Sequence, residues 1–169
     1  INIQRYKKNY NYYFMTIYAL STGPGKSGIA IVRVSGKETK KVIKLLTGKK
    51  LPSPKVATLR KINYINTSEL IDEGLVLWFP GPESYTGEDM AEFHVHGSKS
   101  VIQALYKSIS KVQNCRMAEP GEFTKLAFHN GKVNLLKAES IADLISAETE
   151  LQRLQAVKVM KGNSSEKFN

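Results

Sequence analysis

The chain has 169 residues, of which 41% are hydrophobic, and a formal net charge of +10. This length suits one domain of ordinary size, or a small domain followed by a helical segment, and the apolar content excludes a disordered chain. The longest apolar runs, such as residues 28–34 and 74–79, fall well short of the ~20 residues that a membrane span requires, so we expect a soluble protein with no membrane partner.

The basic excess lies in the first third of the chain. Residues 1–61 contain 14 Lys or Arg against one acid, Glu38, whereas residues 62–169 contain 11 against 14 acids. Such a segment suits a polyanionic partner. An ordinary solvated face of a lysine-rich helix is the simpler interpretation for four of these residues: Lys37, Lys40, Lys41 and Lys44.

Two features bear on the cellular compartment. Residues 1–14 are rich in Asn and Tyr and contain no acid, so we expect a disordered extension ahead of a start at Met15. An organellar targeting peptide is the alternative, although the segment lacks the usual enrichment in Ser and Arg. Cys115 is the only cysteine, which excludes an internal disulfide and favours a reducing compartment, the cytoplasm.

The first half of the chain predicts strands with one helix among them. Apolar and β-branched runs predict strands at residues 16–20 and 28–34, joined by a loop rich in Gly and Ser. Ser35 is expected to be the N-cap of an amphipathic helix that ends at Gly48. Further strands are expected at residues 56–65, 74–79 and 90–95, with an acidic turn at residues 69–73 and a Pro-rich loop at residues 80–88.

The second half predicts helices. Apolar spacing indicates helices at residues 100–112 and 122–130, with Phe123, Leu126, Ala127 and Phe128 on the buried side of the latter. A single long helix is expected from Leu135 to Met160, because apolar residues recur at helical spacing through this segment. Its apolar stripe needs a partner that the preceding small domain does not supply.

A short motif resembles a phosphate-binding loop but is not one. Gly25-Lys26-Ser27 matches the end of the pattern Gly-x-x-x-x-Gly-Lys-Ser, yet Leu20 occupies the first glycine position. A helix should follow such a loop so that its N–H groups meet the phosphates, whereas the β-branched run 29–32 predicts a strand. A stand-alone nucleotide binder is therefore a weak hypothesis.

Three longer segments are more specific. They are residues 25–36, residues 79–89 continuing to Glu92 and His96-Gly97, and residues 119–132. In order and spacing they resemble the N-terminal domain of the MnmE (TrmE) family of tRNA modification GTPases, and the likeness runs from about Met15 to the end of the chain. Residues 139–145 are similar to the start of the central helical domain of that family, which would explain the unpartnered helix.

The resemblance implies the fold and the domains. The expected fold is α+β: a small mixed β-sheet with packed helices, of the tetrahydrofolate-binding, TrmE N-terminal type, followed by a long helix that begins an all-α domain. The extension would cover residues 1–14, the folate-binding and dimerisation domain residues 15–132, and the start of the helical domain residues 133–169. The GTPase domain, with its GTP, magnesium and potassium, is absent, so we expect no GTP hydrolysis by this fragment.

The resemblance also implies a function and partners. The complete protein would form a homodimer and act with an FAD protein of the MnmG type. Together they would add a carboxymethylaminomethyl-type group to the wobble uridine of certain tRNAs, using a carbon from a bound tetrahydrofolate, either the 5-formyl or the 5,10-methylene derivative.

Three residues match the folate-binding positions of the family. Arg33 can form forked hydrogen bonds, Glu92 can accept two N–H groups from a 2-amino-pyrimidinone edge, and Lys132 suits an anionic part of the ligand. An edge arginine in a salt bridge, a solvated strand glutamate and a surface lysine would explain the residue types alone. The family match favours a folate site; no catalytic residue is assigned.

Other candidate residues are weaker. His94 and His96 would share one face of a strand, but two ligands without a third make a poor metal site, and His94 departs from the family pattern. We expect them to be structural or to line the ligand site. Cys115 has no activating neighbour and is interpreted as a buried thiol. Tyr85 and Thr86 are left without a role, although their loop could frame the pocket.

An alternative function remains open. A small basic RNA-binding or scaffold domain could keep the fold without binding folate, as the positive charge of the first third suggests.

Overall fold

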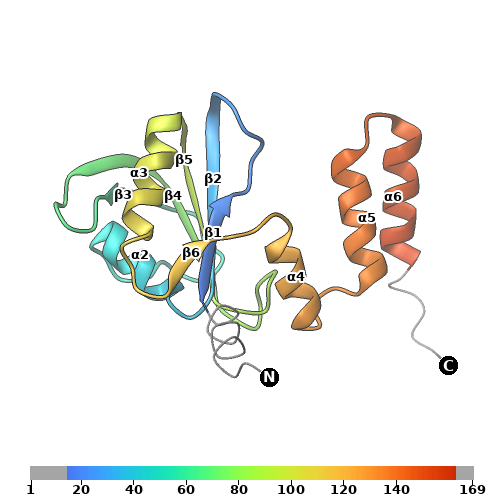
Figure 1. The fold of residues 1–169 in the computed structure, drawn as a ribbon, viewed down its shortest axis with the longest axis horizontal. Coiled ribbons are helices and arrows are strands. Elements are labelled where there is room, and N and C mark those ends of the chain that lie inside the picture. Colours follow the sequence, from blue (N-terminus) through green and yellow to red (C-terminus); the bar gives the residue numbers. More distant parts are fainter. Residues whose placement is uncertain (1–14, 163–169) are drawn as a thin grey trace, which may run out of the picture. The chain divides into compact units, whose positions relative to one another are not determined.

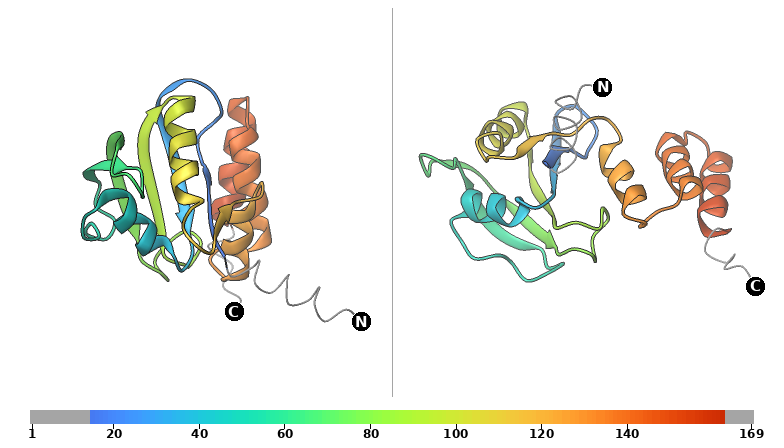
Figure 2. Two further views of the ribbon diagram at one scale, coloured as in Figure 1. Left: turned by 60° about the vertical axis from the view of Figure 1, so that its left-hand side comes forward. Right: turned by 60° about the horizontal axis from the view of Figure 1, so that its bottom comes forward.

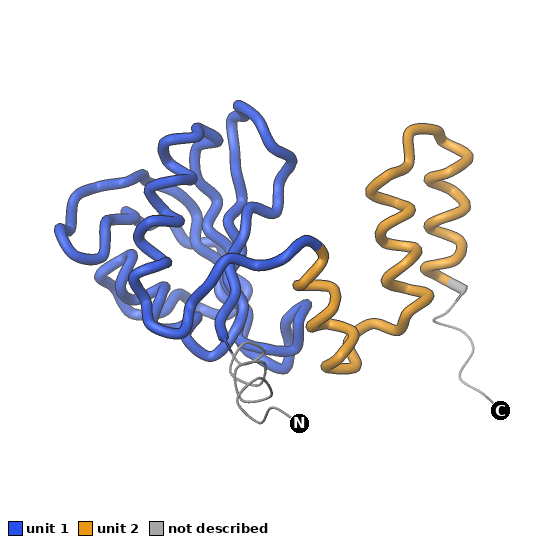
Figure 3. The backbone as a smooth tube through the Cα atoms, viewed as in Figure 1, with its two compact units in different colours: residues 1–120 blue, residues 121–169 orange. Residues whose placement is uncertain are grey.

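The computed structural model describes residues 15–162, so the extension expected at residues 1–14 lies outside the described part. The chain divides into two compact units, residues 1–120 and 121–169 (Figure 3). Each unit is described by itself.

The first unit contains a mixed sheet of six strands in the order β3-β4-β5-β2-β1-β6 (Figure 1). The strands are β1 (Thr16–Leu20), β2 (Ser27–Ser35), β3 (Thr58–Asn63), β4 (Leu70–Phe79), β5 (Met90–Gly97) and β6 (Cys115–Met117). All neighbours pair antiparallel except β1 and β6, which pair parallel. The expected α+β class is confirmed.

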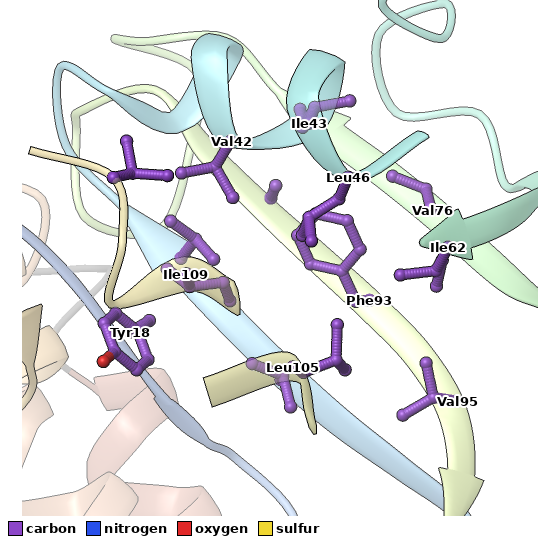
Figure 4. Packing of buried hydrophobic residues seen from close by; sticks show 14 of the residues in the cluster. Tyr18, Val42, Ile43, Leu46, Ile62, Val76, Phe93, Val95, Leu105 and Ile109 are labelled. Atoms are coloured by element: carbon purple, nitrogen blue, oxygen red, sulfur yellow. The ribbon is translucent and has the colours of Figure 1, made fainter. Parts of the chain in front are cut away.

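One face of the sheet carries the hydrophobic core. In β2 the apolar residues alternate, so Ala30, Val32 and Val34 are buried on one face, opposite residues of β5 that are also buried. Helices α2 (Thr39–Thr47) and α3 (Lys99–Ile109) cover this face (Figure 4). Their buried core residues are Val42, Ile43, Leu46, Leu105 and Ile109.

The second face of the sheet carries the side chains at the alternate positions of each strand, which point away from the core. Arg33 of β2 lies opposite Glu92 of β5, and the same row continues to Leu77 of β4. The exposed large apolar residues of the first unit include Ile29 at 62%, Leu59 at 60% and Leu75 at 40%. Polar and apolar side chains therefore meet on this face.

The expected N-cap at Ser35 is wrong. Strand β2 continues through Ser35, which pairs with Ile17 on one side and Met90 on the other. Pairing on both sides satisfies its backbone better than a helix start would. The helix begins at Thr39 after a turn at Gly36, and it ends at Gly48 in the left-handed conformation, as expected.

Two strands also differ from expectation. β4 begins at Leu70, within the expected acidic turn, because Asp72 and Glu73 pair with residues of β3. The short strand β6 is not predicted by the sequence; it completes the sheet beside β1. Strand β1 lies where the sequence predicts it, and β2, β3 and β5 differ from the predicted bounds by at most two residues at either end.

The second unit contains helices α4 (Glu122–His129), α5 (Leu135–Ser146) and α6 (Glu150–Gly162). The single long helix expected from Leu135 to Met160 is wrong, since α5 and α6 are separate helices that lie side by side in Figure 1 and in the right-hand view of Figure 2. Phe128, expected on the buried side of α4, is 45% exposed.

A side-chain cap explains why the long helix breaks. The Oε1 atom of Gln152 accepts from the N–H groups of Glu148 (2.9 Å) and Thr149 (3.0 Å). In return, Oγ1 of Thr149 accepts from the N–H of Gln152 at 3.3 Å. This reciprocal pattern is a capping box, so α6 starts anew at Glu150. No helix within residues 15–162 is long and apolar enough to cross a membrane.

Candidate functional site

Arg33 and Glu92 face each other on neighbouring strands of the second sheet face. The Nε and Nη2 atoms of Arg33 donate to the same atom of Glu92, Oε1, at 3.1 and 2.8 Å. Their side chains are 26% and 14% exposed. The structure thus brings together two of the three residues expected to bind the ligand.

The other oxygen of this carboxylate has a different partner. The Nε2 atom of His94 lies 3.2 Å from Oε2 of Glu92. Because an ionised carboxylate only accepts hydrogen bonds, Nε2 must carry the proton in this contact. Each oxygen of Glu92 is therefore held by a separate side chain.

The loop between β4 and β5 lies beside this group. The Cζ atom of Arg33 lies 5.6 Å from the centroid of the Tyr85 ring, within range of a cation–π interaction. Next to it, Thr86 is fully buried, and its hydroxyl lies 2.7 Å from the hydroxyl of Ser35. The sequence assigns no role to Tyr85 or Thr86. In the structure Tyr85 contacts Arg33, and Thr86 anchors the loop.

A second anchor of the loop is Glu88. Its carboxylate accepts a hydrogen bond from the Ser35 hydroxyl at 3.3 Å. Burial raises the pKa of Glu88 above its ordinary value, while the hydrogen bond from Ser35 and the charge of Lys37 oppose the rise. The loop is thus tied to the end of β2 by polar contacts.

Lys132, the third expected residue, belongs to the second unit and is placed only within that unit. It follows Gly131, which has a φ of +67°, in the turn after α4. Its N–H donates to the carbonyl of Ala127 at 2.8 Å, and its side chain is exposed. The turn fixes its backbone and leaves its ammonium group accessible.

His96 lies two residues beyond His94 but has its own carboxylate. Its Nδ1 atom lies 2.8 Å from Oδ1 of Asp72, and its side chain is 74% exposed. Burial acts to raise the pKa of Asp72, but hydrogen bonds from the backbone and ring of His96 outweigh it and the pKa is lowered. Among residues 15–162 no group of three His, Cys, Asp or Glu side chains is arranged to hold a metal ion.

A shallow hollow of about 220 Å³ lies beside His94 on the same sheet face. Its lining residues are Gly28, Ile29, Leu59, Glu73, Gly74, Leu75, His94, Val95 and His96. A carboxylate, a guanidinium, an aromatic ring and an apolar hollow thus lie on one face. This set can recognise a planar polar ring, since it offers both acceptors and donors as well as apolar surface.

The Gly25-Lys26-Ser27 triplet does not form a phosphate-binding helix start. A strand follows the triplet, as the sequence predicts, and it begins at Ser27, one residue earlier than expected. Its hydroxyl donates to the carbonyl of Ile29 at 2.6 Å. Cys115 is buried and free in β6, as expected.

The comparisons with known proteins agree with this fold. The family model described as "GTP-binding protein TrmE N-terminus" matches residues 16–132. The tRNA modification GTPase MnmE of Pelagibacter ubique is 81% identical over 155 residues, which cover 92% of this chain and 35% of that protein. That of Parvibaculum lavamentivorans is 46% identical over 87% of this chain and 34% of its own length.

A mitochondrial relative is also similar. The Danio rerio protein named 5-taurinomethyluridine-[tRNA] synthase subunit GTPB3, mitochondrial, is 51% identical over 88% of this chain and 29% of its own length. The chain thus spans about a third of the length of these relatives. By the family match over residues 16–132, the chain belongs to the TrmE N-terminus family.

Proposed function

We propose that residues 15–132 form the tetrahydrofolate-binding and dimerisation domain of a tRNA-modifying GTPase, and that residues 133–169 begin its central helical domain. The observation that carries the proposal is the Arg33–Glu92 pair beside Tyr85, at two of the positions that match the folate-binding residues of the family. Lys132 supplies the third position.

The hydrogen-bonding groups of Glu92 and Arg33 fit a reduced folate. The carboxylate of Glu92 offers about four lone-pair positions, of which Arg33 occupies two on Oε1 and His94 one on Oε2. A 2-amino-pyrimidinone edge brings two N–H groups, so Arg33 has to turn at least one nitrogen away from Glu92. That nitrogen then becomes available for a carbonyl or carboxylate of the ligand. The bound folate supplies the carbon that is transferred to the uridine.

The exposed apolar residues support dimerisation. Ile29, Leu59 and Leu75 are exposed on the second sheet face around the hollow. Exposed apolar surface of this kind is typical of protein interfaces. A second copy of the domain would cover it, and the folate site beside it would then lie near the interface.

The wider activity belongs to the complete protein. We propose that it hydrolyses GTP with magnesium and potassium, and acts with an FAD protein of the MnmG type on the wobble uridine of tRNA. The support is that the relatives are named as tRNA modification GTPases. We propose a cytoplasmic location, with an organelle as the alternative because two relatives are named as mitochondrial.

The direct test is calorimetric titration of 5-formyltetrahydrofolate into the chain. The unmodified chain should bind saturably, and Glu92→Ala should weaken binding at least about tenfold, because a charged acceptor is lost. Glu69→Ala is the matched control, since Glu69 is an exposed glutamate just before β4 that does not line the hollow. Absence of saturable binding by the unmodified chain would overturn the proposal.

A basic RNA-binding domain without folate is the second candidate. Lys37, Lys40, Lys41 and Lys44 are exposed on or beside α2, which favours it. Two of them already have acidic partners: Lys40 lies 3.0 Å from Asp89 and Lys41 lies 3.8 Å from Glu38. Steeply salt-dependent tRNA binding, together with no folate binding, would favour this candidate.

A further inference from the structure

His94 contacts the second oxygen of Glu92, Oε2, whereas Arg33 binds the first. The two residues of this contact are two positions apart on β5, so their side chains lie on the same sheet face. The Nε2–Oε2 distance is 3.2 Å, and the His94 side chain is only 25% exposed. His94 is also one of the residues that line the hollow.

This contact controls the orientation of the carboxylate. The terminal torsion of a glutamate is broad, so a carboxylate held at one oxygen can turn about its axis. The Nε and Nη2 atoms of Arg33 both bind Oε1. A second donor on Oε2 fixes the plane of the group.

Resting on the proposed function, we propose that His94 is a positioning residue of the folate site. When Arg33 turns a nitrogen toward the ligand, the Nε2–H of His94 keeps the Glu92 carboxylate in the plane that a 2-amino-pyrimidinone edge requires. His94 thereby sets the preference for ligands that carry the 2-amino group.

The same strand provides a matched control. His96 lies on the same face and has the same side chain, but it is tied to Asp72 and is 74% exposed. A substitution at His96 therefore tests the general effect of removing an imidazole from this face without disturbing Glu92.

The experiment compares two ligands by calorimetry: 5-formyltetrahydrofolate and its analogue in which a methyl group replaces the 2-amino group. His94→Leu should weaken the folate about tenfold, while His94→Gln should stay within about threefold of the unmodified chain, because its amide can donate from nearly the position of Nε2. His96→Leu also changes the lining of the hollow, so any change in affinity that it causes should be equal for the two ligands and leave the ratio of their affinities unchanged. The analogue should bind the unmodified chain and His94→Leu equally.

The outcomes separate the two proposals. Unchanged folate binding by His94→Leu, or an equal loss with both ligands, overturns the positioning role while the folate site stands. If the unmodified chain binds no folate, the proposed function fails and this inference fails with it.

If thermal melting shows that His94→Leu does not fold, a second pair of variants tests the positioning role. The measurement is then the ratio of the two ligand affinities in His94→Gln and in His94→Asn. The shorter asparagine amide would end short of Oε2, so His94→Asn should lose the preference that His94→Gln keeps. Equal ratios in these two variants would overturn the positioning role.

Discussion

Arg33 and Glu92 lie directly opposite each other on β2 and β5, and two nitrogens of the arginine donate to one oxygen of the carboxylate. Neither side chain is fully buried, so solvent weakens the attraction between their charges. We therefore expect the ion pair to contribute only modestly to the stability of the fold.

A double-mutant cycle measures this pair. Arg33→Met and Glu92→Gln should each lower the free energy of unfolding, and the double variant should be less destabilised than the sum, with a coupling of about 1 kcal/mol. The cause is that each single variant removes one charge of the ion pair, so the attraction between the two side chains is lost in either variant and cannot be lost again in the double variant. Urea denaturation at neutral pH gives the free energies. Strictly additive effects would show that the ion pair does not couple the strands.

Gly36 lies in the turn between β2 and α2, where there is no room for a side chain. Its φ is +134°, and an added Cβ would lie 2.6 Å from the backbone Cα of Thr16. Gly36→Ala should therefore destabilise the chain by more than about 2 kcal/mol, through steric overlap and backbone strain together. Thermal melting should show the loss.

Gly23→Ala is the control for this prediction. No atom lies within 4 Å of a Cβ built there, and its φ is not in the left-handed region. Its stability should stay within about 0.5 kcal/mol of the unmodified chain. Equal melting temperatures for the two alanine variants would contradict the assigned role of Gly36.

Local patterns predict most of the strands. The strands at residues 16–20 and around residues 28–34 can be identified from the sequence, because alternating apolar residues and β-branched side chains are signals carried by the strand itself. The same patterns misplace the start of α2, since Ser35 is suited to a cap but is held by strands on both sides. Strand β6 has only three residues, too few for any periodic signal, and it forms through its pairing with β1.

The site is predictable in part. Residue type and family resemblance identify Arg33 and Glu92, but only the register of β2 against β5 brings them into contact. Tyr85 has no role at the level of sequence because its contact with Arg33 depends on how the loop folds back. The spacing of Glu92 and His94 does carry a signal, since residues two apart on a strand share a face, and it indicates a carboxylate partner for His94 rather than a metal.

The break between α5 and α6 is also visible in the sequence. Thr149 is followed three residues later by Gln152, the spacing of a capping box. Continuous apolar spacing through residues 135–160 hides this signal. Helical periodicity alone does not distinguish one long helix from two short ones.

The capping box gives a third prediction. Gln152→Ala should lower the stability of the helical hairpin by about 1 kcal/mol, because the N–H groups of Glu148 and Thr149 lose their acceptor. Amide hydrogen exchange at these two positions should accelerate. Gln155→Ala, on the same helix outside the cap, is the control and should leave their exchange unchanged. Equal protection in both variants would contradict the cap.

Cys115 makes the stability of the fold depend on pH at the alkaline end. Burial, with the charge of Glu38, raises the pKa of its thiol from 9.0 to about 11. Below pH 9 the thiol is protonated in both states. Between pH 9 and 11 only the unfolded chain loses the proton, so the free energy of unfolding falls as pH rises. Urea denaturation across this range should show a shallower fall for Cys115→Ala than for the unmodified chain. Burial also raises the pKa of Tyr18, and the charge of Cys115 adds to that rise, so Cys115→Ala makes the fall shallower through both groups. Parallel curves would mean that Cys115 titrates normally.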